Sequence, residues 1–217
     1  MENLILQLAL WAVPVILAIT LHEAAHGYVA KMRGDPTAYQ LGRITLNPFK
    51  HIDRVGTLIV PGVIVLMNAL TGASMPVFGW AKPVPVDFRR LHNPKADMLW
   101  VAAAGPGSNF VQAFLWALAL SVFSRVLEGD SLWLVLMQNG MVANLVLMLV
   151  NLVPVPPLDG GRILVSLLPM RQAVALSRVE PYGFFILIAL LYLNVLDVVL
   201  GWFLPGLFKF LLLISGV

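Results

Sequence analysis

Cysteine is absent from this sequence, and charged residues are scarce. Without cysteine the chain has no disulfide framework, no thiolate nucleophile and no metal site built on thiolates. Only 12% of its 217 residues are charged, whereas 59% are hydrophobic. This composition lies far from that of a soluble domain. The sequence therefore predicts an integral, multi-pass membrane protein.

The basic excess is small and dispersed. The sequence has 14 Lys and Arg against 11 Asp and Glu, and these bases lie in the connecting segments rather than in one tract. Such a distribution suits membrane orientation better than nucleic-acid binding, so we expect no nucleic-acid partner. The first apolar run follows Met1-Glu2-Asn3 without a basic segment before it, so we expect no separate signal peptide.

Several apolar runs approach the roughly 20 residues that a spanning helix needs. They cover about residues 4–31, 55–72, 96–123, 132–153, 182–200 and 201–217. We predict an all-α polytopic membrane protein, a bundle of about five to six transmembrane or re-entrant helices. Short β-strand segments are expected in the loops, at LGRITL (41–46) and AKPVPV (81–86). The chain is treated as one domain, 1–217, with a core of about 4–168 and C-terminal helices at about 179–217. Its oligomeric state stays open.

Basic residues near the ends of the spans predict the topology. Segments 31–54, 82–95 and 162–178 are rich in Lys and Arg, whereas segment 125–130 has one base and two acids. The first three are therefore expected on the cytoplasmic side. A full span over 55–72 would separate its two basic flanks, so we favour a re-entrant hairpin bent at Pro61-Gly62. Whether 201–217 spans the bilayer or lies at its interface is left open, since Pro205 interrupts this short run.

The first apolar run contains His22-Glu23-Ala24-Ala25-His26, the pattern H-E-x-x-H. On a helix, histidines four residues apart lie on one face and can reach one ion. Glu23 lies one step round the helix, where it can act as a general base towards water. A histidine pair hydrogen-bonded inside a bundle is the simpler alternative. However, ionisable groups at membrane depth cost on the order of 3 kcal/mol each, and a zinc ion would give all three a common reason.

A catalytic zinc usually has a third protein ligand. Four residues are candidates from their type alone, namely His51, His92, Asp53 and Asp159. His51 and His92 lie in polar loops where solvated histidines are common, and Asp53 could pair with Arg54 or cap a helix. Asp159 follows an apolar span and a proline-rich turn, although it too could serve as a helix cap. Spacing alone does not bring it to the histidines.

Three blocks of the chain together resemble the site-2 protease family of intramembrane zinc metalloproteases. They are HEAAHG in the first apolar run, AGPGSN (104–109) and NLVPVPPLDGG (151–161), in that family's order. RITLNPFKHID and GWAKPVPVDF are similar to segments of its small bacterial and archaeal members. The likeness covers about residues 15–165, and neither a PDZ domain nor a CBS pair is apparent.

The resemblance implies roles for individual residues. His22, His26 and Asp159 would be ligands of one Zn²⁺ per chain, and Glu23 would be the base. Asn151 would help to hold or polarise the substrate carbonyl, and Asn109 would have a supporting role. The implied substrates are transmembrane proteins cleaved within or near their spans. The implied location is a prokaryotic cell membrane, with the active site towards the cytoplasm.

Two non-enzymatic functions compete with proteolysis. In the first, a structural zinc site would stabilise a membrane protein that binds or sequesters partner helices, but such a site has no use for Glu23 beside the metal. In the second, a metal transporter would need a succession of ligand sites, and the sequence has one cluster. The remaining amides at membrane depth, Gln112, Asn139 and Asn144, are expected to form hydrogen bonds between helices.

Overall fold

The computed structural model describes residues 2–72, 79–127, 129 and 131–216, and every regular element in these ranges is helical. The main helices are α1 (Glu2–Met32), α3 (Val60–Thr71), α4 (Pro94–Phe123), α5 (Leu132–Asn151) and α9 (Val195–Ser215). Shorter α-helices are α2 (Thr37–Gln40), α6 (Asp159–Leu167), α7 (Met170–Ser177) and α8 (Gly183–Tyr192). The remaining elements are η1 (Pro48–Lys50), the π-helix η2 (Arg54–Ile59), η3 (Phe88–Arg90) and η4 (Glu180–Tyr182).

Within the described residues, five helices are long and apolar enough to cross a membrane. They cover Ile5–Met32, Arg54–Thr71, Pro94–Phe123, Leu132–Asn151 and Val195–Ser215. A sixth span results if the bent pair Met170–Tyr182 and Phe185–Tyr192, which meet at 83°, counts as one. The predicted number of five to six membrane helices is therefore confirmed.

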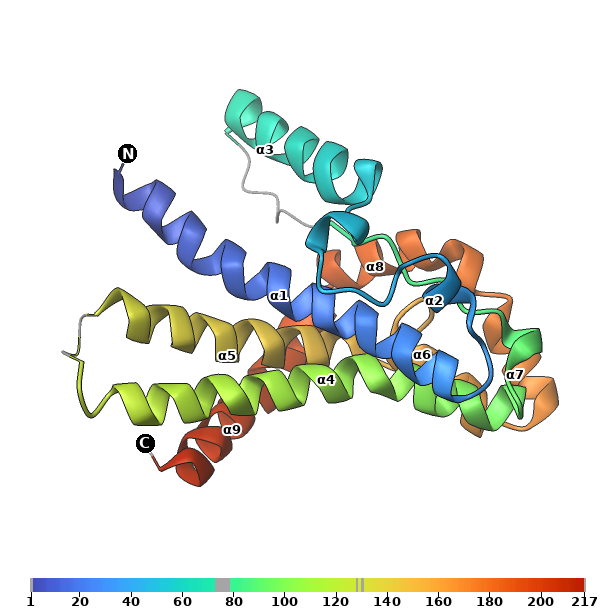
Figure 1. Cartoon of the computed structure of the whole chain (residues 1–217). Coiled ribbons are helices and arrows are strands. Elements are labelled where there is room, and N and C mark those ends of the chain that lie inside the picture. The colour runs from blue at the N-terminus through green and yellow to red at the C-terminus, as the bar shows by residue number, and fades with distance from the viewer. Residues whose placement is uncertain (1, 73–78, 128, 130, 217) are drawn as a thin grey trace.

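Helices α1, α4 and α5 form the centre of the bundle (Figure 1). α4 and α5 lie side by side and antiparallel, and α1 packs along both. α9 packs against α5 and α4, and α6 packs against α4 near the end of the bundle where α1 terminates. This arrangement places the C-terminal half of α1, the N-terminal half of α4 and the start of α6 beside one another.

The largest apolar core lies between α4, α5 and α9. Ala113 and Ala117 of α4 are fully buried against Met141 and Leu145 of α5. Small side chains let membrane helices approach closely, so that van der Waals contact can hold them together where lipid is as apolar as the interior. Gly140 shows the same principle, because a Cβ atom there would lie 2.4 Å from the Trp116 ring.

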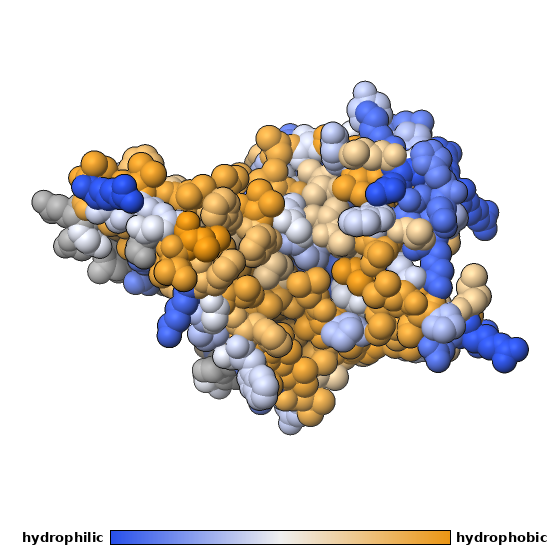
Figure 2. Space-filling model, turned by 90° about the horizontal axis from the view of Figure 1, so that it is seen from below, coloured by the Kyte–Doolittle hydropathy of each residue, from blue (hydrophilic) through white to orange (hydrophobic). Residues whose placement is uncertain are grey.

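Large apolar side chains also cover much of the outer surface. Val65, Leu66 and Trp202 are all more than half exposed. Figure 2 shows an extensive apolar surface over the length of the bundle, with hydrophilic residues gathered mainly at one end. This is the distribution expected of a protein whose sides face lipid.

The predicted β-strands in the loops were wrong for the residues that the structure describes. Residues 41–46 lie mostly in turns and bends, and residues 81–86 have no regular secondary structure and join no ladder. Pro83 and Pro85 have no amide proton to donate. The neighbouring amides of Lys82 and Val84 bond singly, to His51 O and to Glu23 Oε2. The segment is therefore an irregular loop without a partner strand.

The bend predicted at Pro61-Gly62 was also wrong. The two flanks of this segment still meet, because the Trp80 amide donates to Gly56 O at 3.2 Å. Helical structure continues from Arg54 through η2 and α3 to Thr71. Pro61 lies in the first turn of α3, where a helix needs no amide donor, so the proline does not bend the chain back. α3 stands apart from the central helices (Figure 1).

The break between the last helices was placed incorrectly as well. The sequence suggested one span over 182–200, but α8 ends at Tyr192 and α9 begins at Val195. Asn194 between them has φ of 54°, a left-handed conformation that asparagine tolerates better than most residues. The uninterrupted apolar pattern conceals this break, and the last run becomes a helix of spanning length.

Candidate metal centre

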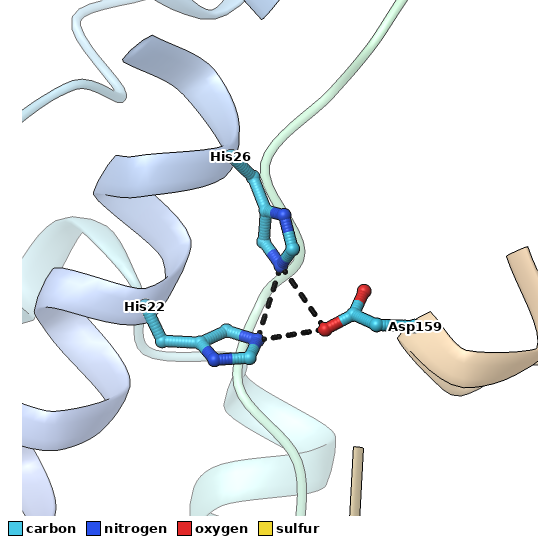
Figure 3. Close-up of side chains that lie close together, drawn as sticks. All are labelled: His22, His26 and Asp159. Atoms are coloured by element: carbon cyan, nitrogen blue, oxygen red, sulfur yellow. Dashed lines mark hydrogen bonds and ion pairs between the residues drawn. The ribbon is translucent and has the colours of Figure 1, made fainter. Parts of the chain in front are cut away.

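His22, His26 and Asp159 meet in the interior of the protein (Figure 3). The Nε2 atoms of His22 and His26 lie 3.0 Å apart, and Asp159 Oδ2 lies 3.1 Å and 3.3 Å from them. All three residues are at most 8% exposed. Among the described residues this is the one group of three such side chains that could hold a metal ion.

Two different elements supply these side chains. α1 continues unbroken past His22 and His26, so its 3.6-residue period stacks them one turn apart on the face that meets α4. Asp159 is the first residue of α6, and the proline-rich turn before it ends α5 and redirects the chain. Packing of α6 against α4 then brings Asp159 to the histidines.

The remaining ring nitrogens set the direction of both imidazoles. His22 Nδ1 lies 2.6 Å from Asn109 Oδ1, and His26 Nδ1 lies 2.7 Å from the Val101 carbonyl oxygen. Since both oxygens can only accept, each Nδ1–H donates and each neutral ring presents its Nε2 lone pair to the centre of the group. A metal-ligating histidine typically has this second contact.

The three atoms at the centre are therefore all acceptors. Asp159 Oδ2 is buried and has no hydrogen-bond donor within the protein. Two lone pairs and a carboxylate oxygen at about 3 Å need a cation between them, and a donor set of two imidazoles and one carboxylate fits zinc.

Gly105 of α4 makes room for this arrangement. A Cβ atom on Gly105 would lie 2.4 Å from His26 Nε2 and 2.6 Å from His22 Nε2. Any larger residue would therefore occupy the space between the imidazoles. Sequence reasoning missed this role, although the run of small residues AGPGS around Gly105 is a signal of close approach.

Glu23 lies beside the group in a cavity of about 530 Å³ that His22, His26 and Asp159 also line. Its Oε2 accepts a hydrogen bond of 2.8 Å from the backbone amide of Val84. The donor belongs to the loop segment 80–87, which passes over α1 at this point. Sequence reasoning did not identify Val84, although a single amide between Pro83 and Pro85 marks it.

Segment 80–87 is held at several points. Lys82 N donates to His51 O at 2.8 Å, and Arg43 Nη2 donates to Lys82 O at the same distance. Asp87 N donates to Oδ2 of the fully buried Asp35 at 2.6 Å. These contacts fix the Val84 amide in front of Glu23.

The two asparagines singled out from the sequence lie in different surroundings. Asn151, at the end of α5, lines the cavity, and its Nδ2 donates to Leu147 O at 2.9 Å. Asn109 is fully buried, and its carboxamide is engaged with His22, Asn144 and the Ala18 carbonyl. Asn151 therefore faces the cavity, whereas Asn109 faces His22.

The other candidates for the third ligand lie away from the group. Asp53 accepts hydrogen bonds from the amides of Val55 and Gly56, so it caps η2. His51 is buried with its Nε2 directed to the Thr45 carbonyl, and His92 is exposed. Asp159 alone of the four lies against the histidine pair.

Comparison with known proteins agrees with these features. The model of "Peptidase family M50" matches residues 129–194. YwhC of Bacillus subtilis (strain 168), named as a candidate zinc metalloprotease, is 37% identical over 82% of this chain and 78% of its own length. Rip2 of Mycolicibacterium smegmatis, named in the same way, is 30% identical over 87% of this chain and 67% of its own. No solved structure matches the chain.

The fold and the site together define the class of this protein. It is a helical, multi-pass membrane protein with a buried His-His-Asp site for zinc, and so a membrane-embedded zinc metalloprotein. The chain belongs to peptidase family M50, the site-2 protease family. It is an intramembrane zinc metalloprotease of that family, and its recognised relatives are bacterial.

Proposed function

We propose that this protease hydrolyses peptide bonds within or near the transmembrane segments of other membrane proteins. His22, His26 and Asp159 would hold one Zn²⁺, and Glu23 would be the general base. One observation carries this assignment. The buried acceptor atoms of His22, His26 and Asp159 converge, and the Glu23 carboxylate lies beside them without being part of the group. We treat residues 1–217 as one catalytic domain, with its core at about 4–168 and accessory helices at about 179–217.

Zinc bound to these residues would supply Lewis-acid activation of water and polarisation of the scissile carbonyl. The protein's own part is to orient the ligands and to move a proton. Val84 N–H engages Glu23 Oε2, so we assign proton acceptance from the attacking water to Oε1. The same carboxyl group then returns this proton to the leaving amine, and the cleaved peptide separates as an amine and an acid.

Asn151 is suited to assist at the substrate carbonyl. It lines the cavity, and one of its two amide protons is already directed to Leu147 O, which fixes the orientation of the carboxamide. The second proton can donate to an oxygen that gains negative charge. Asn109 has a supporting role of another kind, through its contact with His22.

The substrate must present an extended peptide to this cavity. In a transmembrane helix each carbonyl is hydrogen-bonded within the helix, so the scissile bond becomes accessible after local unwinding. Trp80, Val84 and Leu187 give the cavity apolar walls, which suit the side chains of a membrane span.

We infer that the metal centre lies towards the cytoplasm. The ends of the helices near the metal centre connect through segments that contain most of the bases, including Lys31, Arg43, Lys95 and Arg162. The segment that joins α4 to α5 at the other end contains Arg125 with Glu128 and Asp130. The positive-inside tendency favours the first end as cytoplasmic, in a bacterial cell membrane.

The decisive experiment compares two variants of the full chain in detergent or proteoliposomes, with a model single-span substrate. Glu23→Gln should retain one zinc per chain by elemental analysis and lose at least about a hundredfold in cleavage rate, because it cannot accept a proton. Asp159→Ala should lose both zinc and cleavage. Full cleavage by Glu23→Gln, or full zinc occupancy of Asp159→Ala, would contradict the assigned role.

A further inference from the structure

We propose that Asn144 of α5 is a positioning residue for the metal centre, acting through Asn109 to fix the orientation of His22. Asn144 is remote from the zinc ligands in sequence and lies on a different helix. This role rests on the proposed function, because it takes His22 as a ligand of zinc.

A chain of hydrogen bonds connects three helices in the centre of the bundle. His22 Nδ1 of α1 lies 2.6 Å from Asn109 Oδ1 of α4, and Asn109 Nδ2 lies 2.9 Å from Asn144 Oδ1 of α5. Asn144 Nδ2 in turn donates to Gly140 O at 2.9 Å. Both asparagines are 0% exposed. We call the series Gly140 O, Asn144, Asn109, His22 the asparagine relay.

The direction of the asparagine relay is set at its far end. A backbone carbonyl can only accept, so the amino group of Asn144 faces Gly140 O and its Oδ1 faces Asn109. Asn109 must then present its amino group to Asn144, and the same amino group reaches Ala18 O at 3.3 Å. Its own oxygen is left facing His22, which therefore holds a proton on Nδ1 and a lone pair on Nε2.

A flipped Asn109 would be costly in this environment. Its oxygen would oppose Asn144 Oδ1 and the Ala18 carbonyl, and its amino group would oppose the His22 ring nitrogen. Water is excluded from these fully buried groups, so mismatched donors and acceptors would stay unpaired. Asn144 thus selects the Asn109 orientation that directs Nε2 of His22 to Asp159.

The second histidine shows why His22 needs this support. His26 Nδ1 donates directly to the Val101 backbone carbonyl, an acceptor that cannot reverse its polarity. His22 instead relies on a side-chain carboxamide, whose two ends differ in polarity but hardly in shape. Asn144, at 2.9 Å, and the more distant Ala18 carbonyl, at 3.3 Å, distinguish the two orientations of that carboxamide.

The test compares Asn144→Leu with a matched control on the same helix. Asn139 also joins α5 to α1, donating from Nδ2 to Leu10 O at 3.3 Å, but it is outside the asparagine relay. Zinc affinity of each purified full-length variant would be measured by competition with a chelator. We expect Asn144→Leu to bind zinc about tenfold more weakly or worse, as is usual for residues that support metal ligands. Asn139→Leu should remain within about twofold of the unsubstituted protein, because the Asn139 side chain donates to Leu10 O and not to a group of the relay.

A second background separates positioning from general loss of structure. In Asn109→Asp both carboxylate oxygens accept, so the His22 contact no longer depends on which way the group faces. Asn144→Leu should therefore cost less than about threefold in zinc affinity in the Asn109→Asp background. Equal losses in both backgrounds, or no loss in the original one, would overturn the proposal. Should Asn144→Leu not fold, Asn144→Ala would be measured in the same cycle with the same expected outcomes.

The same measurements distinguish a failure of the asparagine relay from a failure of the proposed function. His22→Ala is expected to lose zinc, and retention of zinc by His22→Ala would contradict the ligand assignment itself. If His22→Ala loses zinc but Asn144→Leu binds zinc with unchanged affinity, only the asparagine relay is rejected. The absorption spectrum of the Co²⁺-substituted protein adds an independent readout, because it should change in Asn144→Leu and stay the same in Asn139→Leu.

Discussion

The Val84 backbone amide donates a 2.8 Å hydrogen bond to Oε2 of Glu23, which lies 61 residues earlier in the chain. Pro83 and Pro85 on either side have no amide proton, so Val84 provides the single donor of this short stretch. The contact joins the loop segment 80–87 to the carboxylate that we assign as the base.

Val84→Pro removes the amide proton, whereas Val84→Ala keeps it and shortens only the side chain. A hydrogen bond to a charged group contributes about 1.5–3 kcal/mol, and 1.4 kcal/mol corresponds to a tenfold change in rate. We therefore expect Val84→Pro to cleave about tenfold or more slowly than Val84→Ala, with both retaining zinc. Kinetics on a model single-span substrate, with zinc analysis of the same samples, would measure this. Faster cleavage by Val84→Pro would show instead that the contact holds the base back.

Gly105→Ala is expected to abolish zinc binding. Its new Cβ would lie 2.4 Å from His26 Nε2, closer than any real contact, so the imidazoles would have to leave their positions. Gly107→Ala, two residues further along α4, is the matched control, since nothing lies within 4 Å of that Cβ. The control should bind zinc normally, and it should be slightly more stable because alanine favours a helix over glycine by about 0.5–1 kcal/mol. Zinc content and thermal unfolding of both variants would decide the matter, and normal zinc content in Gly105→Ala would refute the expected crowding.

The absence of cysteine makes the membrane orientation directly testable. Gln40→Cys would place a thiol at the end of the bundle near the metal centre, and Ser124→Cys would place one at the other end, both at exposed positions. We expect a membrane-impermeant thiol reagent added to intact cells to label Ser124→Cys at once. Gln40→Cys should react only after the membrane is permeabilised, because its segment faces the cytoplasm. The reverse labelling pattern would overturn the proposed orientation.

Several parts of the protein could be predicted because they depend on local sequence. Apolar runs of bilayer length indicate spanning helices whatever their neighbours, and the five to six helices were predicted in this way. The positions of breaks within such runs were harder to predict from the sequence. Asn194 interrupts an apolar stretch through its backbone conformation, and Pro61 fits the first turn of a helix instead of bending it. The strands predicted in the loops failed because a strand requires a partner, and segment 80–87 bonds to side chains and single carbonyls instead.

For the metal centre, the sequence by itself determined the pairing of His22 with His26. Four residues on a helix always stack two side chains on one face, and Glu23 follows one step round. Tertiary structure decided the rest, because packing of α6 and α4 against α1 places Asp159, Gly105 and Asn109 around that pair. The contacts of Val84 with Glu23 and of Asn144 with Asn109 span 61 and 35 residues. Helix periodicity cannot encode such distances, so close packing of helices far apart in the sequence brings these residues together.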